Sequence, residues 1–249
     1  MSEQTIDVSD YDRSGYDYRQ YWDKRQYDNA VEQKIISQTL PHFSESLIDI
    51  GGGFGRLISS YQDKAKHITV FDYSNNNLNV AQSIIEAKGY EHIQTQQGDI
   101  YSMPFKDASF DTAIILRVIH HLERTSLALH EINRVMKPSG TLILQFANKV
   151  HLKNRLKALI TRDATIINPK PVNLSKDGIF FQFHPDFIKE KLKENGFVVE
   201  QIISSSNIRI PFIYRMIPVP VLLFFETLLT PIFTKFYLGP SIFVIARKQ

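Results

Sequence analysis

The stretch that decides the fold is LIDIGGGFGR, residues 47–56. A short apolar run leads directly into a turn with the pattern Asp-x-Gly-x-Gly-x-Gly, and a segment of helical character follows it. Glycines are needed in such a turn because a backbone that bends sharply beside a ligand leaves no room for a Cβ atom. The dinucleotide-binding pattern G-x-G-x-x-G would place its third glycine at position 56, where this chain has Arg56. The turn therefore predicts a ligand site at the end of this strand and disfavours a dinucleotide as its ligand.

Short apolar runs alternate with amphipathic stretches on both sides of the turn. The apolar runs predict strands at residues 47–50, 67–71, 92–96, 112–116, 141–146, 197–203 and 241–246. The amphipathic stretches predict helices at residues 56–62, 76–88, 126–136 and 186–194. This alternation is typical of βαβ units, in which the strands form a mainly parallel sheet with helices on its faces. We therefore predict a single α/β domain over residues 1–249.

Two segments interrupt the alternation and read as insertions. Residues 148–183 contain seven Lys or Arg and two Asp, which gives this segment a charge of +5. Its apolar residues at helical spacing would share one face, so that its basic side chains would face water, phosphate or anionic lipid; these apolar residues are Leu152, Leu156, Leu159 and Ile160.

The second insertion, residues 208–238, is strongly apolar. Its longest uncharged run has ten residues, and four prolines interrupt the segment. A helix that spans a bilayer needs about 20 apolar residues, so we do not expect a transmembrane helix. We expect instead a cap that buries its apolar face over the ligand site. A surface that dips into a membrane is the alternative.

The composition excludes several kinds of chemistry. The chain has no cysteine, which rules out disulfides, thiolate nucleophiles and cysteine-ligated clusters and fits a reducing compartment. The N-terminal residues are polar and acidic and lack the basic start and apolar core of a signal peptide, so we expect a cytoplasmic protein. The formal net charge of +3 is small for a nucleic-acid-binding protein. We expect neither a nucleic-acid partner nor a metal site.

Two acidic residues follow predicted strands at positions that suit a bound nucleoside. Asp72 ends the second strand, 23 residues after Asp49, where a carboxylate can accept hydrogen bonds from both ribose hydroxyls. Asp99 follows the third strand and is placed to accept a hydrogen bond from an adenine amino group, with Ile100 packed on the ring. A loop carboxylate without a role in binding is the alternative for Asp99.

Four segments in a fixed order, LIDIGGGFGRL, VFDYS, GDIYSMPFKDASFDTAIILRVIHHLE and EINRVMKPSGTLILQF, resemble the class I S-adenosylmethionine (SAM)-dependent methyltransferases. The resemblance extends over roughly residues 47–146 and is greatest to the small-molecule group that includes the ubiquinone and menaquinone methyltransferases. It implies SAM as the cofactor and a Rossmann-like, mainly parallel sheet of seven strands, with helices on both faces and the last strand antiparallel. The positions it implies for SAM are Asp49, Gly51, Gly53 and Gly55 for the methionine part, Asp72 for the ribose, and Tyr73, Asp99 and Ile100 for the adenine.

The turn after the fourth predicted strand, residues 117–122, should line the same site, because ligands of open α/β sheets bind at the carboxyl ends of the strands. A histidine there can act as a general base toward a hydroxyl or a carbon acid, since its ordinary pKa of about 6.5 is near neutral pH. The resemblance favours His121 as this base, and a structural histidine that caps the next helix is the alternative. Arg117 is placed to approach the methionine end of SAM, unless it forms a surface ion pair. The turn also lacks the Asn/Asp-Pro-Pro-aromatic tetrad of N6-adenine methyltransferases, which argues against a nucleic-acid acceptor.

The N-terminal segment, residues 1–44, is dense in aromatic side chains between residues 16 and 27. In related enzymes a segment of this kind folds over the cofactor as a lid, and Arg25 would then pair with the SAM carboxylate. An amphipathic helix that packs on the sheet is the alternative.

Together these patterns predict a SAM-dependent methyltransferase that acts on a small or lipid-like, partly apolar acceptor, with peripheral contact to a membrane left open. Two other interpretations stand beside it. One is an NAD-dependent oxidoreductase on a Rossmann fold, which Arg56 disfavours, and the other is a SAM-binding module without catalytic activity. The acceptor atom and the oligomeric state do not follow from these patterns.

Overall fold

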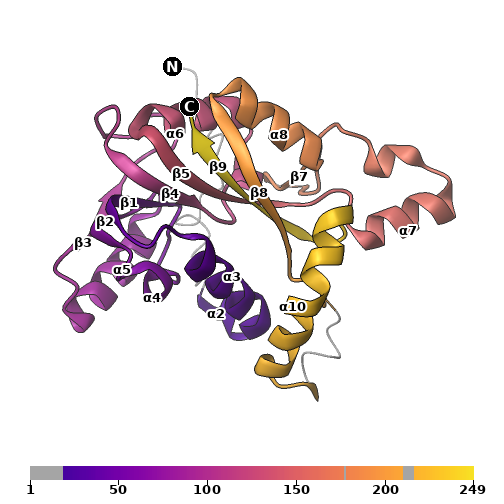
Figure 1. The fold of residues 1–249 in the computed structure, drawn as a ribbon, viewed down its shortest axis with the longest axis horizontal. Coiled ribbons are helices and arrows are strands. Elements are labelled where there is room, and N and C mark those ends of the chain that lie inside the picture. Colours follow the sequence, from indigo (N-terminus) through magenta and orange to yellow (C-terminus); the bar gives the residue numbers. More distant parts are fainter. Residues whose placement is uncertain (1–18, 177, 210–215) are drawn as a thin grey trace.

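A computed structural model describes residues 19–176, 178–209 and 216–249 of the chain. Its centre is a seven-stranded sheet with the strand order β3-β2-β1-β4-β5-β9-β8 (Figure 1). All neighbours pair in parallel except β9, which is antiparallel to both β5 and β8. The strands are β1 (Ser44–Ile50), β2 (Ala65–Asp72), β3 (Ile93–Gln97), β4 (Phe110–Ile115), β5 (Met136–Ala147), β8 (Phe197–Ser205) and β9 (Ser241–Lys248). The predicted strands and the antiparallel last strand are confirmed.

The order of the strands places a ligand site beside β1. The chain builds outward from β1 to β2 and β3, and then crosses back to place β4 on the other side of β1. Loops that leave β1 and β4 therefore diverge, and open α/β sheets bind their ligands in the crevice formed at such a switch of direction. The glycine turn begins directly after Ile50, at this crevice.

Helices cover both faces of the sheet (Figure 1). Helices α3 (Gln26–Thr39), α4 (Ile58–Tyr61) and α5 (Asn75–Lys88) pack on one face, where Val31, Ile58 and Leu78 join Leu47 and Val70 in one buried cluster. Helices α6 (Thr125–Val135) and α8 (Pro185–Glu194) pack on the other face. The predicted helices are thus confirmed, with a later start for α4, because the turn that contains Gly55 continues through residue 57.

The N-terminal segment is described from α2 (Arg19–Asp23) onward, and the part of the expected lid at residues 1–18 lies outside the described residues. Helix α3 packs on the sheet beside α4, which is the amphipathic helix that the sequence left as an alternative. Trp22 is buried at the end of α2 and reaches the glycine turn, so this short helix adds one wall to the ligand site.

The basic insertion forms α7 (Leu152–Thr161), the 3-10 helix η2 (Ala164–Ile167) and a small hairpin of β6 (Val172–Asn173) and β7 (Phe181–Gln182). Helix α7 projects away from the sheet at the right of the molecule in Figure 1. Its apolar residues do share one helical face, as predicted. They are exposed, however, and the basic residues Lys153, Arg155 and Lys157 are exposed as well, so that both kinds of side chain meet the solvent.

The apolar insertion forms α10 (Val219–Phe236), which packs against β8 and α3. Residues 210–215 of the insertion lie outside the described residues. The expectation that prolines break this segment is wrong for Pro231, which lies inside the helix, while Pro218 and Pro220 stand at its start, where a missing N–H is tolerated. By length and composition α10 could cross a membrane, and only 11% of the residues in its 18-residue apolar window are buried.

Candidate active site

The glycine turn packs closely against the segment that follows β4. Gly51 has a φ of 70°, and a Cβ atom added there would lie 2.1 Å from Cγ2 of Val118, so only glycine fits. The N–H of Gly53 donates a hydrogen bond of 2.8 Å to Oδ2 of Asp72, and the N–H of Ser74 donates one of 2.8 Å to Oδ1 of the same carboxylate. The turn and the tip of β2 therefore fix the Asp72 carboxylate at the rim of a cavity.

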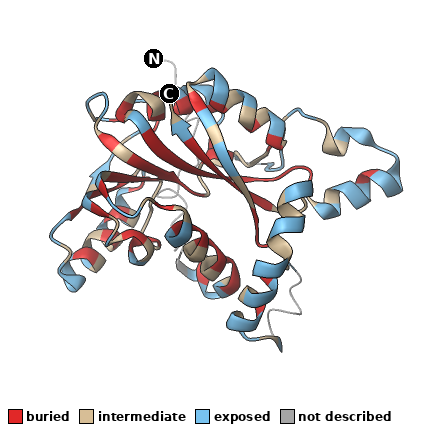
Figure 2. Cartoon of the chain, in the orientation of Figure 1, coloured by how far each residue is buried: buried red, intermediate tan, exposed pale blue. Residues whose placement is uncertain are grey.

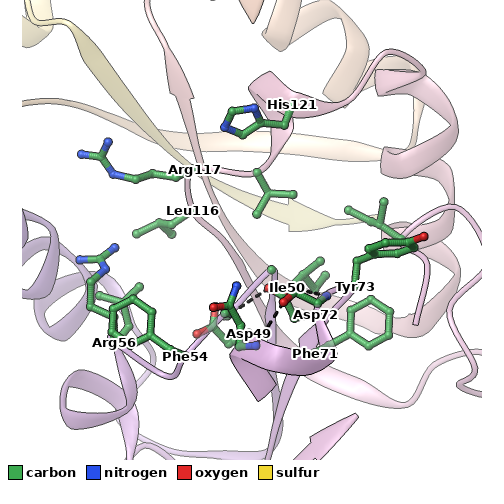
Figure 3. Close-up of a pocket in the computed structure, with 18 of the residues that line it drawn as sticks. Asp49, Ile50, Phe54, Arg56, Phe71, Asp72, Tyr73, Leu116, Arg117 and His121 are labelled. Carbon is green, nitrogen blue, oxygen red and sulfur yellow. Dashed lines mark hydrogen bonds between the residues drawn. The ribbon is translucent and has the colours of Figure 1, made fainter. Parts of the chain in front are cut away.

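The cavity lies at the carboxyl ends of β1, β2 and β4 and the loop after β3 (Figure 3). Most of the residues that the sequence assigns to a ligand site line it together. They are Asp49, Gly51, Gly53, Asp72, Tyr73, Asp99, Ile100, Arg117 and His121. The lining residues that sequence reasoning missed include Trp22, Phe54, Arg56, Phe71, Leu116 and Val118. Of these, Phe54 and Arg56 adjoin the last glycine, so their position in the motif was the available signal.

Two of the assigned residues, Gly55 and Arg25, lie outside the lining of this cavity. Gly55 shapes the turn, since a Cβ atom there would lie 2.6 Å from Cδ1 of Ile58. Arg25 precedes the first turn of α3, where its guanidinium forms an ion pair of 3.5 Å with Asp28 and lies 4.3 Å from the centre of the Tyr21 ring. These contacts hold Arg25 against its own helix. The arginines that reach the cavity are Arg56 and Arg117.

A buried carboxylate joins these two arginines. Glu32 of α3 is 1% exposed, and its oxygens lie 2.7 Å from Nη2 of Arg56 and 2.6 Å from Nη2 of Arg117. Burial alone would raise the pKa of Glu32, but the charges and hydrogen bonds of Arg117 and Arg56 outweigh it and lower the pKa below its ordinary value. Trp22 lies against both guanidinium groups, 3.6 Å from that of Arg56 and 4.7 Å from that of Arg117. Helix α3 and Trp22 thus position the arginine side of the cavity.

Asp49 provides a buried negative charge beneath the turn. Its side chain accepts a hydrogen bond of 2.8 Å from the hydroxyl of Tyr61. Burial raises the pKa of Asp49, while the hydrogen bond from Tyr61 and the charge of Arg56 lower it. The effect of burial is the larger, and the pKa is raised to about 6. The carboxylate is therefore charged at neutral pH but incompletely stabilised, which suits a site that receives a positively charged group of a ligand.

Two histidines follow β4 in the 3-10 helix η1 (Ile119–His121). Nδ1 of His121 lies 2.8 Å from the carbonyl oxygen of Ile179, so it must carry the proton, and Nε2 is then the basic nitrogen. Burial lowers the pKa of His121, which keeps the ring neutral at neutral pH. Phe180 packs on both rings, with centroids 4.9 Å from His120 and 5.5 Å from His121. These contacts hold His121 in one orientation, as a general base requires.

A second cavity, of about 860 Å³, adjoins the first. The two share Arg117 and His121 in their walls. The second cavity extends between β5, the start of α7 and the inner side of α10, and Leu229 and Phe233 of α10 contribute to its apolar lining. Its described lining contains Lys153 and Arg209 but neither Asp nor Glu. It can therefore hold an apolar molecule, and its charge favours an anionic group.

The sheet order, the glycine turn and the fixed carboxylate at the tip of β2 define a nucleotide-binding α/β domain of the class I methyltransferase type. Residues 48–144 match the family described as a methyltransferase domain. Residues 48–144 therefore form a methyltransferase domain of this type, and SAM is the methyl donor that such domains use.

Relatives and solved structures agree with this assignment. The chain is 32% identical over 117 residues to the ubiquinone/menaquinone biosynthesis C-methyltransferase UbiE of Rubrivivax gelatinosus, a match that covers 47% of this chain and 45% of that protein. It is 31% identical over 111 residues to the malonyl-[acyl-carrier protein] O-methyltransferase of Erwinia billingiae, covering 45% and 42% of the two. The chain thus spans less than half of the length of these relatives.

The fold as a whole also has counterparts. A SAM-dependent methyltransferase of Thermotoga maritima, described as a possible histamine N-methyltransferase, superposes with a TM-score of 0.64 over 96% of this chain and 98% of its own. The two sequences are 17% identical, so this likeness concerns the fold.

The first cavity fits SAM on its own features. The turn leaves backbone space that Cβ atoms would fill, and the buried Asp49 charge lies where an ammonium group is favourable. Asp72 is fixed where it can accept from ribose hydroxyls, and Ile100 and Tyr73 supply apolar surface for a base. These residues would hold the cofactor.

Proposed function

We propose that the protein transfers the methyl group of SAM to a small or lipid-like, partly apolar acceptor bound in the second cavity. The observation that carries the proposal is the junction of the two cavities at Arg117 and His121. An acceptor in the second cavity would meet the methyl donor at this junction. Holding both reactants in line can supply roughly 7–11 kcal/mol of the reduction in the barrier.

SAM supplies an activated methyl group on a sulfonium centre. The chain has to orient the acceptor, exclude water and take up a proton where the acceptor loses one. His121 is the residue we assign to the proton, because Nε2 is basic, the ring is neutral and Phe180 fixes its orientation. Arg117, fixed by Glu32, would form the cationic wall between the two sites.

The nature of the acceptor is supported by the cavity and by the relatives. By name, one relative is a C-methyltransferase of ubiquinone and menaquinone biosynthesis, and the other is an O-methyltransferase of malonyl-[acyl-carrier protein]. The type of domain alone therefore does not determine whether a carbon or an oxygen atom is methylated. The lining of the second cavity is apolar toward α10 and cationic at Lys153 and Arg209. We infer an acceptor that is partly apolar, and we place the reaction in the cytoplasm, with peripheral contact to a membrane.

Calorimetry with the purified protein tests the first half of the proposal: SAM should bind and NAD should not. Incubation with radiolabelled SAM and fractions of a cellular lipid extract tests the second half, and label should appear in an apolar fraction with release of S-adenosylhomocysteine. Binding of SAM without transfer to any fraction would favour the non-catalytic SAM-binding module. Binding of NAD in place of SAM would overturn the proposal.

A further inference from the structure

Helix α10 presents an apolar stripe that nothing in the described chain covers. Its inner side packs on α3 and β8 through Leu222 and Glu226. Its outer side carries large apolar residues at the spacing i, i+3, i+4, i+7, i+11 and i+15, which is one face of a helix. All six are exposed, Phe224 by 61%; they are Val221, Phe224, Phe225, Leu228, Ile232 and Phe236. Figure 2 shows the helix largely in the colour of exposed residues.

Helix α7 presents a second stripe of the same kind. Leu152, Leu156, Leu159 and Ile160 share one face, and all four are exposed, Ile160 by 80%. The two helices are joined where they meet: the N–H of Leu152 donates to the carbonyl of Leu238 at 2.9 Å, and Arg155 donates to the carbonyl of Phe236 at 3.0 Å. We call the ten exposed apolar residues of α7 and α10 the α7–α10 surface. An exposed apolar surface of this size is typical of an interaction site.

The charges around the α7–α10 surface are almost all positive. Helix α7 contains Lys153, Arg155 and Lys157 and no acidic residue. Helix α10 contains Lys235 and one acid, Glu226, which is buried and accepts hydrogen bonds from Tyr27 and Asn207. Apolar residues interspersed with lysine and arginine are the pattern of helices that lie in the interface of an anionic membrane.

The second cavity lies between the same two helices. Leu152 and Lys153 of α7 and Leu229 and Phe233 of α10 belong to its lining. Arg117 and His121 line the same cavity. A molecule that enters the second cavity from the α7–α10 surface would therefore reach these two residues.

We propose that the α7–α10 surface docks on an anionic lipid bilayer, and that the second cavity takes its acceptor from that bilayer. The second clause rests on the proposed function; the first does not. Helix α10 lies on the bilayer and does not cross it, because Glu226 ties its middle to α3 through a hydrogen bond of 2.5 Å to Tyr27, and Lys34 donates to Thr227 at 2.7 Å. A second copy of the chain fits the surface less well, because it would bring lysines and arginines against lysines and arginines.

Vesicle sedimentation tests the docking. The full chain is mixed with vesicles of phosphatidylcholine alone or with about one third phosphatidylserine, and we expect strong binding only to the second kind. The double variant Phe224→Ser/Leu228→Ser should lower the binding by about tenfold or more, because two inserted side chains are lost. Phe43→Ser, at an apolar residue exposed by 60% before β1, is the matched control and should bind as the unaltered protein does.

A charge variant separates the two contributions. Lys157→Glu/Lys235→Glu should weaken binding to the phosphatidylserine vesicles, while Lys66→Glu/Lys88→Glu, on the β2–α5 side, should leave it unchanged. Thermal unfolding of each variant shows that it is folded. Equal binding of the Phe224→Ser/Leu228→Ser variant and the unaltered protein would overturn the proposal. So would a dimer in sedimentation velocity that this variant dissociates, since the surface would then join two copies.

SAM binding is measured on the same samples by calorimetry. Vesicle binding without SAM binding would leave the docking intact and refute the proposed function. SAM binding and methyl transfer without vesicle binding would refute the docking alone.

Discussion

Glu32 and Arg117 lie 85 residues apart in the sequence and form a buried ion pair of 2.6 Å at the wall of the cofactor cavity. The same carboxylate holds Arg56 at 2.7 Å. Neither arginine could be placed there by its own strand or turn alone, because each long side chain has several rotamers of similar energy. The helix that carries Glu32 therefore decides the shape of a site whose sequence motifs lie elsewhere.

The first prediction concerns this ion pair. Glu32→Gln keeps the shape of the side chain but leaves two poorly solvated arginines without their counter-charge, and we expect the free energy of unfolding to fall by about 3–5 kcal/mol. Urea denaturation measures it. Glu45→Gln, which removes an exposed partner of Lys66 at 3.5 Å, is the control and should change the free energy by about 1 kcal/mol or less.

The pH dependence of the same variant has a defined sign. The pKa of Glu32 is lowered in the folded protein, so its contribution to stability is present above the ordinary pKa of a glutamate and is lost as the pH falls through the lowered value. The difference between the unaltered protein and Glu32→Gln should therefore shrink in acid. A difference that stays constant down to acid unfolding would contradict the assignment of a charged Glu32.

The second prediction concerns the ribose carboxylate. Asp72→Ala should weaken SAM binding by about tenfold or more, because two charge-assisted hydrogen bonds to the ribose would be lost. Calorimetry measures the affinity, and Asp63→Ala, an exposed acid after α4, serves as the control. An unchanged affinity in Asp72→Ala would remove Asp72 from the cofactor site.

The third prediction concerns Asp49, whose pKa is raised to about 6 in the protein without ligand. An ammonium group bound beside it would lower that pKa, so SAM binding should release a proton near pH 6 and should weaken as the pH falls below that value. Calorimetry in buffers of different ionisation enthalpy measures the proton. Asp49→Asn should abolish the pH dependence.

The stability of the ligand-free protein offers an independent check on Asp49. Between pH 3.8, the ordinary pKa of an aspartate, and about pH 6, the carboxyl of Asp49 is protonated in the folded protein but ionised in the unfolded chain. This group therefore lowers the free energy of unfolding as the pH rises through that window. At neutral pH Asp49→Asn should therefore be more stable than the unaltered protein while binding SAM more weakly. A loss of stability in this variant would show that the buried charge is compensated in the ligand-free state.

The fourth prediction concerns His121. If it is the general base, His121→Ala should lower turnover by about 10²–10⁴ and leave the SAM affinity nearly unchanged. Because burial lowers the pKa of His121, the rate should hold as the pH falls through the ordinary histidine range and drop only at a lower pH. His42→Ala, an exposed histidine before β1, is the control. A parallel loss of folding stability and activity in His121→Ala would indicate a structural histidine.

The sequence by itself determined the strands, the glycine turn and the residues that cluster at the ends of β1, β2 and β4. It could do so because these features are local or follow from periodicity: a glycine at a positive φ, an apolar run, or a carboxylate at a strand tip has the same consequence wherever the chain folds in this way. The parallel sheet then brings the strand ends to one edge, so Asp72 and His121 line the same cavity without any further information.

The tertiary structure alone decided which long side chains fill the wall of the site and which apolar faces are covered. Arg25 and Arg56 are both arginines near the motif, yet Arg25 pairs with its own helix and Arg56 with Glu32, because the choice depends on which carboxylate the packing of α3 brings within reach. The apolar residues of α7 and α10 have the spacing of buried helix faces, and the structure leaves them exposed. Periodicity shows that residues share a face; whether another element lies against that face is settled only by the arrangement of the whole chain.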